Sequence, residues 1–322
     1  MVSPSQKRHA AQSVVAAGEC SGRQACRYLG LARSTMAYTP APPTTRERLI
    51  CEEVVAISRR LPRIGYRKVH AMLDRKGLRC DLRTVQRIRR REGLRIIGPA
   101  RRPKLPPRPD AKVKSVAVND VWCVDILFDV TAGGVTVKFL TIVDEFSHFC
   151  LDIVASRRLG AVDVIAALMV LVEIHGAPLH LRCDNGGEFI ADDLKKWLAH
   201  AGIQTRFIEP GSPWQNGVNE SFNGKFRDEC LNRELLVNVL EAQCVARVYR
   251  DEYNNIRPHM TIGYRTPAEY RAELLGQAPG SGRTCQARSS LRLELASVPV
   301  SDHNLNPHHQ PALTLTAGGS TS

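Results

Sequence analysis

Residues 120–130, DVWCVDILFDV, set the fold class, because they begin a series of strand patterns. Their apolar side chains alternate with polar ones or run together, and TAGG at residues 131–134 divides them from a second apolar stretch, VTVKFLTIV. Two such stretches around a short glycine turn are typical of a β-hairpin. HFCLDIVA at residues 148–155 continues the pattern. The sequence therefore predicts a meander of three strands.

Helical and extended patterns alternate after this meander. AVDVIAALMVLVEIHG predicts a helix that ends at Gly176, and residues 177–183 predict the next strand. The remaining expected elements are a helix near 192–201, a short strand IQTRFI, and helices near 216–231 and 238–255. A meander followed by helix-linked strands indicates an α/β fold with a mixed sheet flanked by helices.

Two all-α units precede the sheet. In residues 1–38, QKRHAAQSVVAAG predicts a helix ending at Gly18, Ser21 caps GRQACRYLG, and ARSTMAY follows a short turn. This outline predicts a helix-turn-helix, although ordinary helical hairpins share it. In residues 46–97, the predicted helices are RERLICEEVVAISRR, GYRKVHAMLDRKG and LRTVQRIRRREG, the last with Asp81 as its N-cap and Gly93 as its end.

Three segments lack a core pattern. The Pro-rich residues 39–45, TPAPPTT, predict a linker between the two helical units. Residues 98–115 alternate prolines with basic residues, which predicts an extended linker suited to tracking phosphates. Residues 276–322 are rich in Gly, Ser, Pro, Thr and His, which predicts a disordered tail.

The charge divides unevenly along the chain. Residues 1–114 carry 27 Lys and Arg against 8 Asp and Glu, a net charge of +19, whereas residues 115–322 carry 18 against 24, a net charge of −6. So basic a segment indicates a polyanionic partner, most simply nucleic acid, since a merely soluble surface mixes both signs. On the 82–92 helix we expect Arg83, Arg87 and Arg90 to contact a DNA groove; the alternative is a solvated charged helix.

The composition also restricts the class of protein. The sequence contains no apolar run long enough to cross a bilayer, and its polar, basic start predicts no signal peptide. The ten cysteines are scattered and form no CxxC pair, so we expect reduced thiols in a cytoplasmic protein.

Three carboxylates stand out by their positions. Asp125 lies in the middle of the first strand, where an ionised group is costly unless a cation meets it. Asp184 ends a later strand within CDNGGEF, and Glu220 follows after 35 intervening residues, in the first turn of a helix. Each has an ordinary explanation: an Arg-paired strand residue, a turn former, and a helix acid favoured by the dipole.

The motifs WxxD, DNGxEF and GSPWQNGxxES, in this order and spacing, resemble the catalytic core of bacterial insertion-sequence transposases related to retroviral integrases. More narrowly, the chain resembles the second-reading-frame product of the two-frame elements, from about residue 5 to residue 275, including YRDEYNNIRPHMTIGYRTPAEY. The resemblance implies a ribonuclease-H-like fold and an Asp-Asp-Glu triad at Asp125, Asp184 and Glu220. The family's basic residue seven positions after the glutamate is matched by Arg227, but the zinc module of retroviral integrases and the leucine zipper of the first frame are not matched.

The implied activity is that of a transposase, which binds element ends, cleaves phosphodiester bonds and joins 3′ ends to target DNA. Two Mg²⁺ or Mn²⁺ ions suit this chemistry, with Asp125 as the bridging ligand, Asp184 on one ion and Glu220 on the other. The alternatives are a DNA-binding repressor or domesticated protein with an inactive core, and a structure-selective nuclease without joining activity.

Several neighbouring residues carry further expectations. Glu188 is expected to be a rim or structural residue, and Asn185-Gly186-Gly187 to leave room for DNA backbone. Gly224 lies on the helical face of Glu220, to admit a DNA strand or alternatively to pack tightly against the sheet. Arg227 and Lys225 are expected to contact DNA. The expected partners are element-end and target DNA, further copies of the chain on that DNA, and the first-frame protein, with a nucleoid-associated, cytoplasmic location and no membrane.

Overall fold

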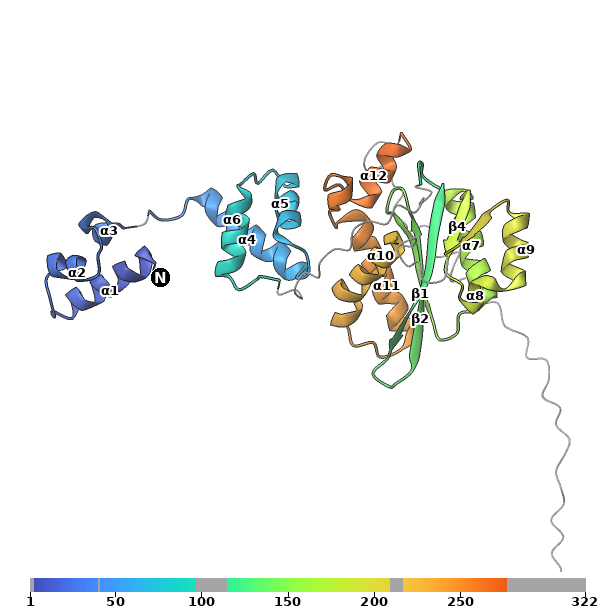
Figure 1. The fold of residues 1–322 in the computed structure, drawn as a ribbon, viewed down its shortest axis with the longest axis horizontal. Helices are drawn as coiled ribbons and strands as arrows, with labels where there is room; N and C mark the ends of the chain where they lie inside the picture. The colour runs from blue at the N-terminus through green and yellow to red at the C-terminus, as the bar shows by residue number, and fades with distance from the viewer. Residues whose placement is uncertain (1–2, 40, 97–114, 209–216, 277–322) are drawn as a thin grey trace, which may run out of the picture.

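The computed structural model describes residues 3–39, 41–96, 115–208 and 217–276 (Figure 1). The predicted basic linker, apart from residue 115, lies outside these residues, and so does the predicted tail, apart from residue 276. The first part of GSPWQNGxxES lies outside them as well. Within the described residues, no helix is long and apolar enough to cross a membrane.

The catalytic-core region contains one five-stranded mixed sheet in the order β3-β2-β1-β4-β5. Its strands are β1 (Val121–Val130), β2 (Thr136–Asp144), β3 (Cys150–Ser156), β4 (His180–Cys183) and β5 (Gln204–Phe207). The first three strands pair antiparallel, as the predicted meander requires, and β4 and β5 pair parallel on the other side of β1. This order and these directions confirm the ribonuclease-H-like α/β prediction.

The β1–β2 hairpin fixes the register of the sheet. Asp125 lies opposite Thr141, and Val130 opposite Thr136 at the end of the hairpin. The turn is held by the Thr131 hydroxyl, which accepts the Val135 N–H at 3.1 Å, while Gly134 adopts a φ of 78°. A glycine accommodates this left-handed conformation without a Cβ clash, which explains the predicted TAGG turn.

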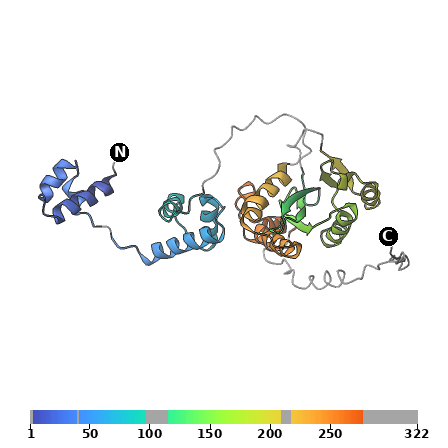
Figure 2. The ribbon, with the colours of Figure 1, turned by 90° about the horizontal axis from the view of Figure 1, so that it is seen from below.

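Helices cover both faces of the sheet (Figures 1 and 2). One face carries α7 (Ala161–His175), α8 (Gly187–Ile190) and α9 (Asp192–His200), and the other carries α10 (Gly217–Glu229) and α11 (Val239–Asn255). Because side chains alternate along a strand, Trp122 and Val124 join the core on the α7–α9 side and Leu127 joins the core on the α10–α11 side. Asp125 shares the parity of Leu127 and so faces α10.

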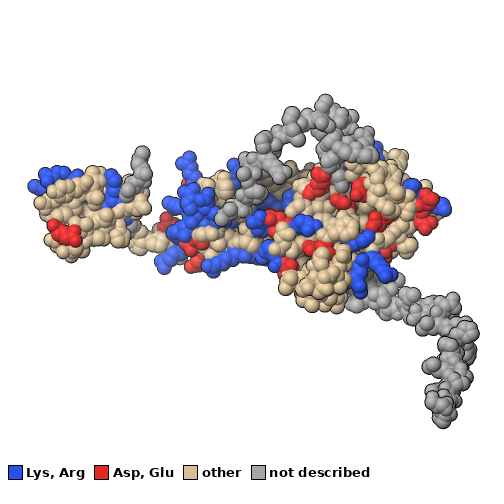
Figure 3. Space-filling view, turned by 60° about the horizontal axis from the view of Figure 1, so that its bottom comes forward, with Lys and Arg blue, Asp and Glu red and all other residues tan. Residues whose placement is uncertain are grey.

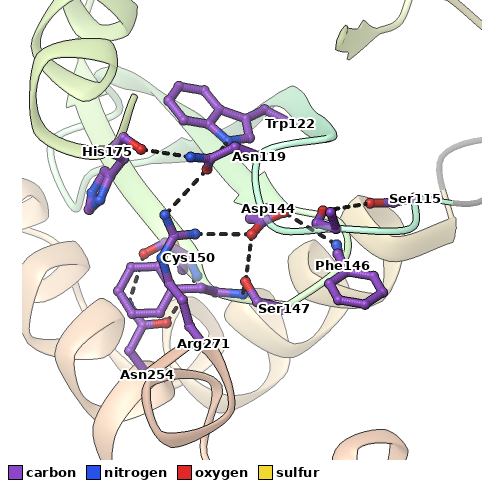
Figure 4. Close-up of polar contacts among 12 residues, drawn as sticks. Ser115, Asn119, Trp122, Asp144, Phe146, Ser147, Cys150, His175, Asn254 and Arg271 are labelled. Carbon is purple, nitrogen blue, oxygen red and sulfur yellow. Dashed lines mark hydrogen bonds and ion pairs between the residues drawn. The ribbon is translucent and has the colours of Figure 1, made fainter. Parts of the chain in front are cut away.

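The segment after α11 closes the core through buried polar contacts (Figure 4). It contains the 3₁₀ helix η3 (Met260–Ile262) and α12 (Pro267–Leu274). Arg271 on α12 donates to Asp144 at 3.0 Å and to the Asn119 side chain at 3.3 Å. Asn254 exchanges two hydrogen bonds with the Cys150 backbone, at 2.9 and 2.8 Å. Much of YRDEYNNIRPHMTIGYRTPAEY is therefore explained by packing.

The first helical unit consists of α1 (Pro4–Ala16), α2 (Gly22–Tyr28) and α3 (Arg33–Ala37). Ser21 caps α2 as predicted, because its side chain accepts the Gln24 N–H while Gln24 reaches back to the Ser21 N–H. The predicted helix end at Gly18 is matched by a left-handed φ of 73° just after α1.

The second helical unit consists of α4 (Thr45–Arg60), α5 (Tyr66–Arg75) and α6 (Leu82–Arg91). Its core is formed by the buried aliphatic side chains Ile50, Val54, Ile57, Ile64, Val69, Leu73, Val85 and Ile88. The helix predicted from residue 46 begins one residue earlier, because Thr44 and Glu47 form a capping box. Asp81 occupies the N-cap of α6 as predicted, although its side chain makes no capping hydrogen bond.

The cysteines agree with the expected reduced state. Within the described parts of the chain no cysteine forms a disulfide, and five of the cysteines are buried, at positions 26, 123, 150, 183 and 230. They pack as small apolar side chains.

Candidate active site

Asp125 lies in the middle of β1 and faces α10. Its Oδ1 accepts the Ile126 N–H at 2.8 Å, and its Oδ2 accepts an N–H of the Asn223 side chain at 2.8 Å. Among the described residues no cation forms an ion pair with Asp125, although the sequence suggested that an ionised group here needs one. Two amide donors hold the carboxylate in place.

The environment of Asp125 disfavours its negative charge. Burial, and to a smaller extent the nearby carboxylates of Asp184 and Glu220, raise the pKa of Asp125 to about 6, against the hydrogen bonds from Ile126 and Asn223. The three carboxylates of the predicted triad therefore lie within electrostatic reach of one another. Among the described residues, no cationic side chain contributes to the pKa of Asp125.

Asp184 follows β4 directly and is exposed. Its Oδ1 accepts the Gly186 N–H at 3.0 Å, and a Cβ at Gly186 would lie only 3.0 Å from that oxygen. The absence of a side chain at Gly186 therefore makes room for the Asp184 and Glu188 carboxylates, which differs from the expected room for DNA. Gly187 has open space instead, and it begins the short helix α8, which the sequence did not predict.

Glu188 is held away from a ligand role by a lysine. Its carboxylate forms an ion pair with Lys138 of β2 at 2.7 Å, and this hydrogen bond lowers the pKa of Glu188. The contact ties α8 to the edge of the β1–β2 hairpin, in agreement with a structural role for Glu188.

Glu220 lies in the first turn of α10 and is exposed. Gly224, one turn further along, has no atom within 4 Å of a built Cβ, so the alternative that it packs tightly against the sheet is wrong. Arg227 donates to the Phe128 carbonyl at 2.9 Å, which joins α10 to the end of β1. Glu220 and Gly224 thus share an open helical face.

The sequence did not identify the amides that support Asp125. The Thr141 hydroxyl lies 3.0 Å from the Asn223 side-chain oxygen and 3.4 Å from that of Asn219. Asn219 is fully buried, and its Nδ2 finds no partner in the described part of the chain. The available signal was the spacing of the two asparagines, one helical turn apart beside the buried Phe222.

A divalent cation suits this carboxylate set in chemistry and charge. Carboxylate oxygens are the hard ligands that Mg²⁺ and Mn²⁺ prefer, and the pKa of Asp125 is raised by burial and by the charges of the two other carboxylates. Among the described residues, however, no three His, Cys, Asp or Glu side chains stand close enough to form a ligand cluster. The structure brings Asp125, Asp184 and Glu220 near one another without closing them around an ion.

The predicted DNA-contact residues fall in two places. Arg83, Arg87 and Arg90 are exposed along one face of α6, and Lys and Arg side chains gather over this second helical unit (Figure 3). Arg89 on the same helix is buried and donates to the Ile64 and Leu94 carbonyls, so it supports the fold. Lys225 is half-buried on α10 and donates to the Ser221 hydroxyl at 2.7 Å.

Two family models match the core region. Both are described as an integrase core domain, one over residues 115–213 and the other over residues 201–267. The chain is 34% identical over 253 residues to an insertion element IS407 protein of Burkholderia multivorans, covering 79% of this chain and 91% of the relative. It is 33% identical over 272 residues to an insertion element IS476 protein of Xanthomonas euvesicatoria, covering 84% of this chain and 78% of the relative.

More distant similarities agree with these. The chain is 27% identical over 229 residues to the transposase InsD of insertion element IS2 of Escherichia coli, covering 65% of this chain and 74% of the relative. Among solved structures, it is similar to the HTLV-2 integrase catalytic core domain, at 17% identity and a TM-score of 0.40, covering 48% of this chain and 98% of that one. The family follows from the closer insertion-element relatives.

Proposed function

Because this chain belongs to the family of insertion-sequence DDE transposases with an integrase core, we propose that it binds insertion-element ends, cleaves phosphodiester bonds there and joins the 3′ ends to target DNA. The observation that carries the proposal is Asp125, a carboxylate embedded in β1 whose pKa is raised by burial and by the charges of Asp184 and Glu220. A buried carboxylate without a cationic partner is costly, so such a site is expected to have a functional reason.

We assign Asp125, Asp184 and Glu220 as the residues that would hold two Mg²⁺ or Mn²⁺ ions. When bound, such ions supply Lewis-acid stabilisation of the attacking and leaving oxygens of the displaced phosphodiester. Asp125 suits a shared ligand position, because the charges of both other carboxylates act on it. The Asn223 amide and the Ile126 N–H restrict the rotation of its carboxylate.

The open face of α10 is assigned to the DNA strand beside the triad. Gly224 leaves space next to Glu220, and Arg227 extends from the same helix toward the end of β1. The Arg227 guanidinium uses one donor on the Phe128 carbonyl and retains others for a phosphate. This arrangement admits a DNA backbone along α10 without displacing a side chain.

The two helical units are assigned to the recognition of element ends. They and the linker carry the net charge of +19, and Arg83, Arg87 and Arg90 form an exposed face on α6. We propose residues 1–38 and 46–97 as the end-binding units, residues 98–115 as a phosphate-tracking linker and residues 116–275 as the catalytic core. A protein with this activity acts with element-end and target DNA, as several copies on that DNA, with the first-frame protein, and in the cytoplasm at the nucleoid.

Purified protein incubated with Mg²⁺ or Mn²⁺ and the DNA that flanks its own gene tests this function. The expected products are strands cleaved at the element ends and 3′ ends joined to a target duplex. Binding of the flanking DNA without either product would favour a repressor with an inactive core. Cleavage without joined product would favour a nuclease.

A further inference from the structure

The second helical unit contacts the core through ion pairs of one polarity. Arg63, between α4 and α5, donates twice to Asp228 of α10, at 3.0 and 2.5 Å. Arg60 pairs with Glu252 of α11 at 3.0 Å, and Arg75 pairs with Glu269 of α12 at 2.8 Å. At each contact the helical unit provides the guanidinium and the core provides the carboxylate. The basic unit therefore lies against an acidic face of the core.

Two lysines at this junction depart from that pattern. Lys68 lies in the first turn of α5, five residues after Arg63, and Lys225 lies on α10, three residues before Asp228. Both are half-buried, and among the described residues neither forms an ion pair. Lys225 donates only to the neutral hydroxyl of Ser221.

Among the described residues, the charged groups that act on the two lysines are one guanidinium, one carboxylate and, for Lys68, the ammonium of Lys225. Arg257 acts on both, as does the carboxylate of Glu229, while His148 and His259 lie within reach of Lys225. Glu229 already accepts two hydrogen bonds from the Arg257 guanidinium. The single carboxylate is thus committed, and two ammonium groups remain without a counterion.

The electrostatic consequences appear on each member of the cluster. Burial, followed by the charge of Arg257, lowers the pKa of Lys68 to about 7 and that of Lys225 to about 8. Burial and the same cations lower the pKa of His259 to about 2. Half-buried like charges destabilise one another, so an anion placed between the lysines would remove a cost that the free protein bears.

A DNA phosphodiester would supply the negative charge that the two lysines lack. It is anionic at every relevant pH, and its oxygens accept hydrogen bonds from ammonium groups on opposite sides. Lysine is a common phosphate ligand as a flexible point charge.

We propose that Lys68 of α5 and Lys225 of α10 bind one DNA backbone phosphate between them. This inference rests on the proposed DNA-binding function. DNA held by the second helical unit would then pass beside α10, the helix that carries Glu220. The bound phosphate would fix the distance along the DNA between the second helical unit and the triad.

Binding of a short mixed-sequence duplex by the full chain, titrated at several salt concentrations, tests the site. Lys68→Gln and Lys225→Gln are each expected to weaken binding roughly five- to tenfold and to reduce the log-log salt slope by about 0.9, one phosphate contact. The double variant is expected to bind about as weakly as either single variant, because both lysines serve one phosphate. Multiplied losses in the double variant would contradict a shared phosphate.

Lys76→Gln is the matched control, because Lys76 lies at the end of the same α5 helix and pairs with Glu53 at 2.5 Å. It is expected to keep the wild-type salt slope. Lys68→Arg retains the charge and is expected to keep most of the affinity. If the log-log salt slope falls as much in Lys76→Gln as in Lys68→Gln and Lys225→Gln, the proposed phosphate site is wrong.

Thermal unfolding without DNA separates binding from folding. Lys68→Gln is expected to keep or raise the Tm, because it removes a half-buried charge that lacks a counterion. A lower Tm would show that the lysine stabilises the free junction, and would overturn the proposal. A wild-type chain that does not bind duplex DNA at all would contradict the proposed function itself, whereas wild-type-like slopes in both Gln variants would contradict only the phosphate site.

Discussion

At the scale of single residues, the proposed function depends most on the environment of Asp125. Its position in an apolar strand predicted a special role, and the structure shows amide donors and two carboxylates around it. The supporting residue Asn223 could not be predicted, because its contact depends on how closely α10 approaches β1. An asparagine on a helix carries no sign of the strand that it will meet.

Asp125→Asn should show the electrostatic cost of the carboxylate as a pH-dependent stability difference. The folded pKa of about 6 lies above the ordinary value of 3.8, so the folded state retains the proton between these pH values and the wild type loses stability as pH rises through this window. In chelator, the free energy of unfolding of the variant relative to the wild type should therefore be greater at pH 7 than at pH 4, by roughly 2–4 kcal/mol. Denaturant unfolding at both pH values measures this, and an equal difference at both would contradict the raised pKa.

Asn223→Ala should impair joining without weakening duplex binding. It removes the hydrogen bond to Asp125 Oδ2 and leaves the Thr141 hydroxyl without that partner. We expect the joining rate to fall roughly tenfold, consistent with 1–2 kcal/mol for one hydrogen bond to a charged group. Val248→Ala at an exposed position of α11 is the control. Joining at the wild-type rate would show that Asn223 does not position Asp125.

At the scale of elements, the sequence predicted the helices and strands that follow from local sequence patterns. It missed the features that depend on tertiary contacts. The hairpin was predictable because two alternating stretches flank a glycine turn, and α7 because its apolar run ends at Gly176. The short α8 was not, because Gly-Gly favours a turn, and there Gly186 makes room for the Asp184 carboxylate. Asp81 was predictable as the N-cap of α6 because Asp favours this position, but its lack of a capping side-chain hydrogen bond was not.

Gly224→Ala should separate the stability of α10 from its function. The Cβ would enter open space, so the helix should gain roughly 0.5–1 kcal/mol in free energy of unfolding. If the DNA strand approaches this face beside Glu220, joining should nevertheless decrease. Thermal unfolding and a joining assay on the same preparation provide both values. A more stable variant that joins at the wild-type rate would exclude close DNA approach at Gly224.

At the scale of the whole molecule, we propose that function is divided between the same two parts of the chain as the charge. The division between a segment of net charge +19 and one of −6 was visible in the sequence, but the ion pairs that bring these parts together were not. Arg63 and Asp228 are 165 residues apart, and only the folded chain shows that they meet. The basic unit is thus partly neutralised by the core, while the α6 face stays exposed.

Separated parts of the chain should keep separate activities. A fragment of residues 1–114 should bind flanking DNA with a steep salt dependence, since each phosphate contact contributes a log-log slope of about −0.9. A fragment that begins at residue 115 should fold and bind Mg²⁺, yet distinguish element ends from scrambled duplex no better than chance. Salt titrations of both fragments on both duplexes measure this. End discrimination by the core fragment alone would contradict the division.

We propose that Asp125, Asp184 and Glu220 perform the chemistry and do not recognise DNA. The most direct test measures joining and end binding together, with Mg²⁺, for the wild type, Asp125→Asn, Asp184→Asn and Glu220→Gln. Each variant should lose cleavage and joining by far more than about tenfold, because the lost carboxylate is a metal ligand, while end binding stays within about twofold. Any one of the three that joins ends within about tenfold of the wild type would contradict the assignment of the triad.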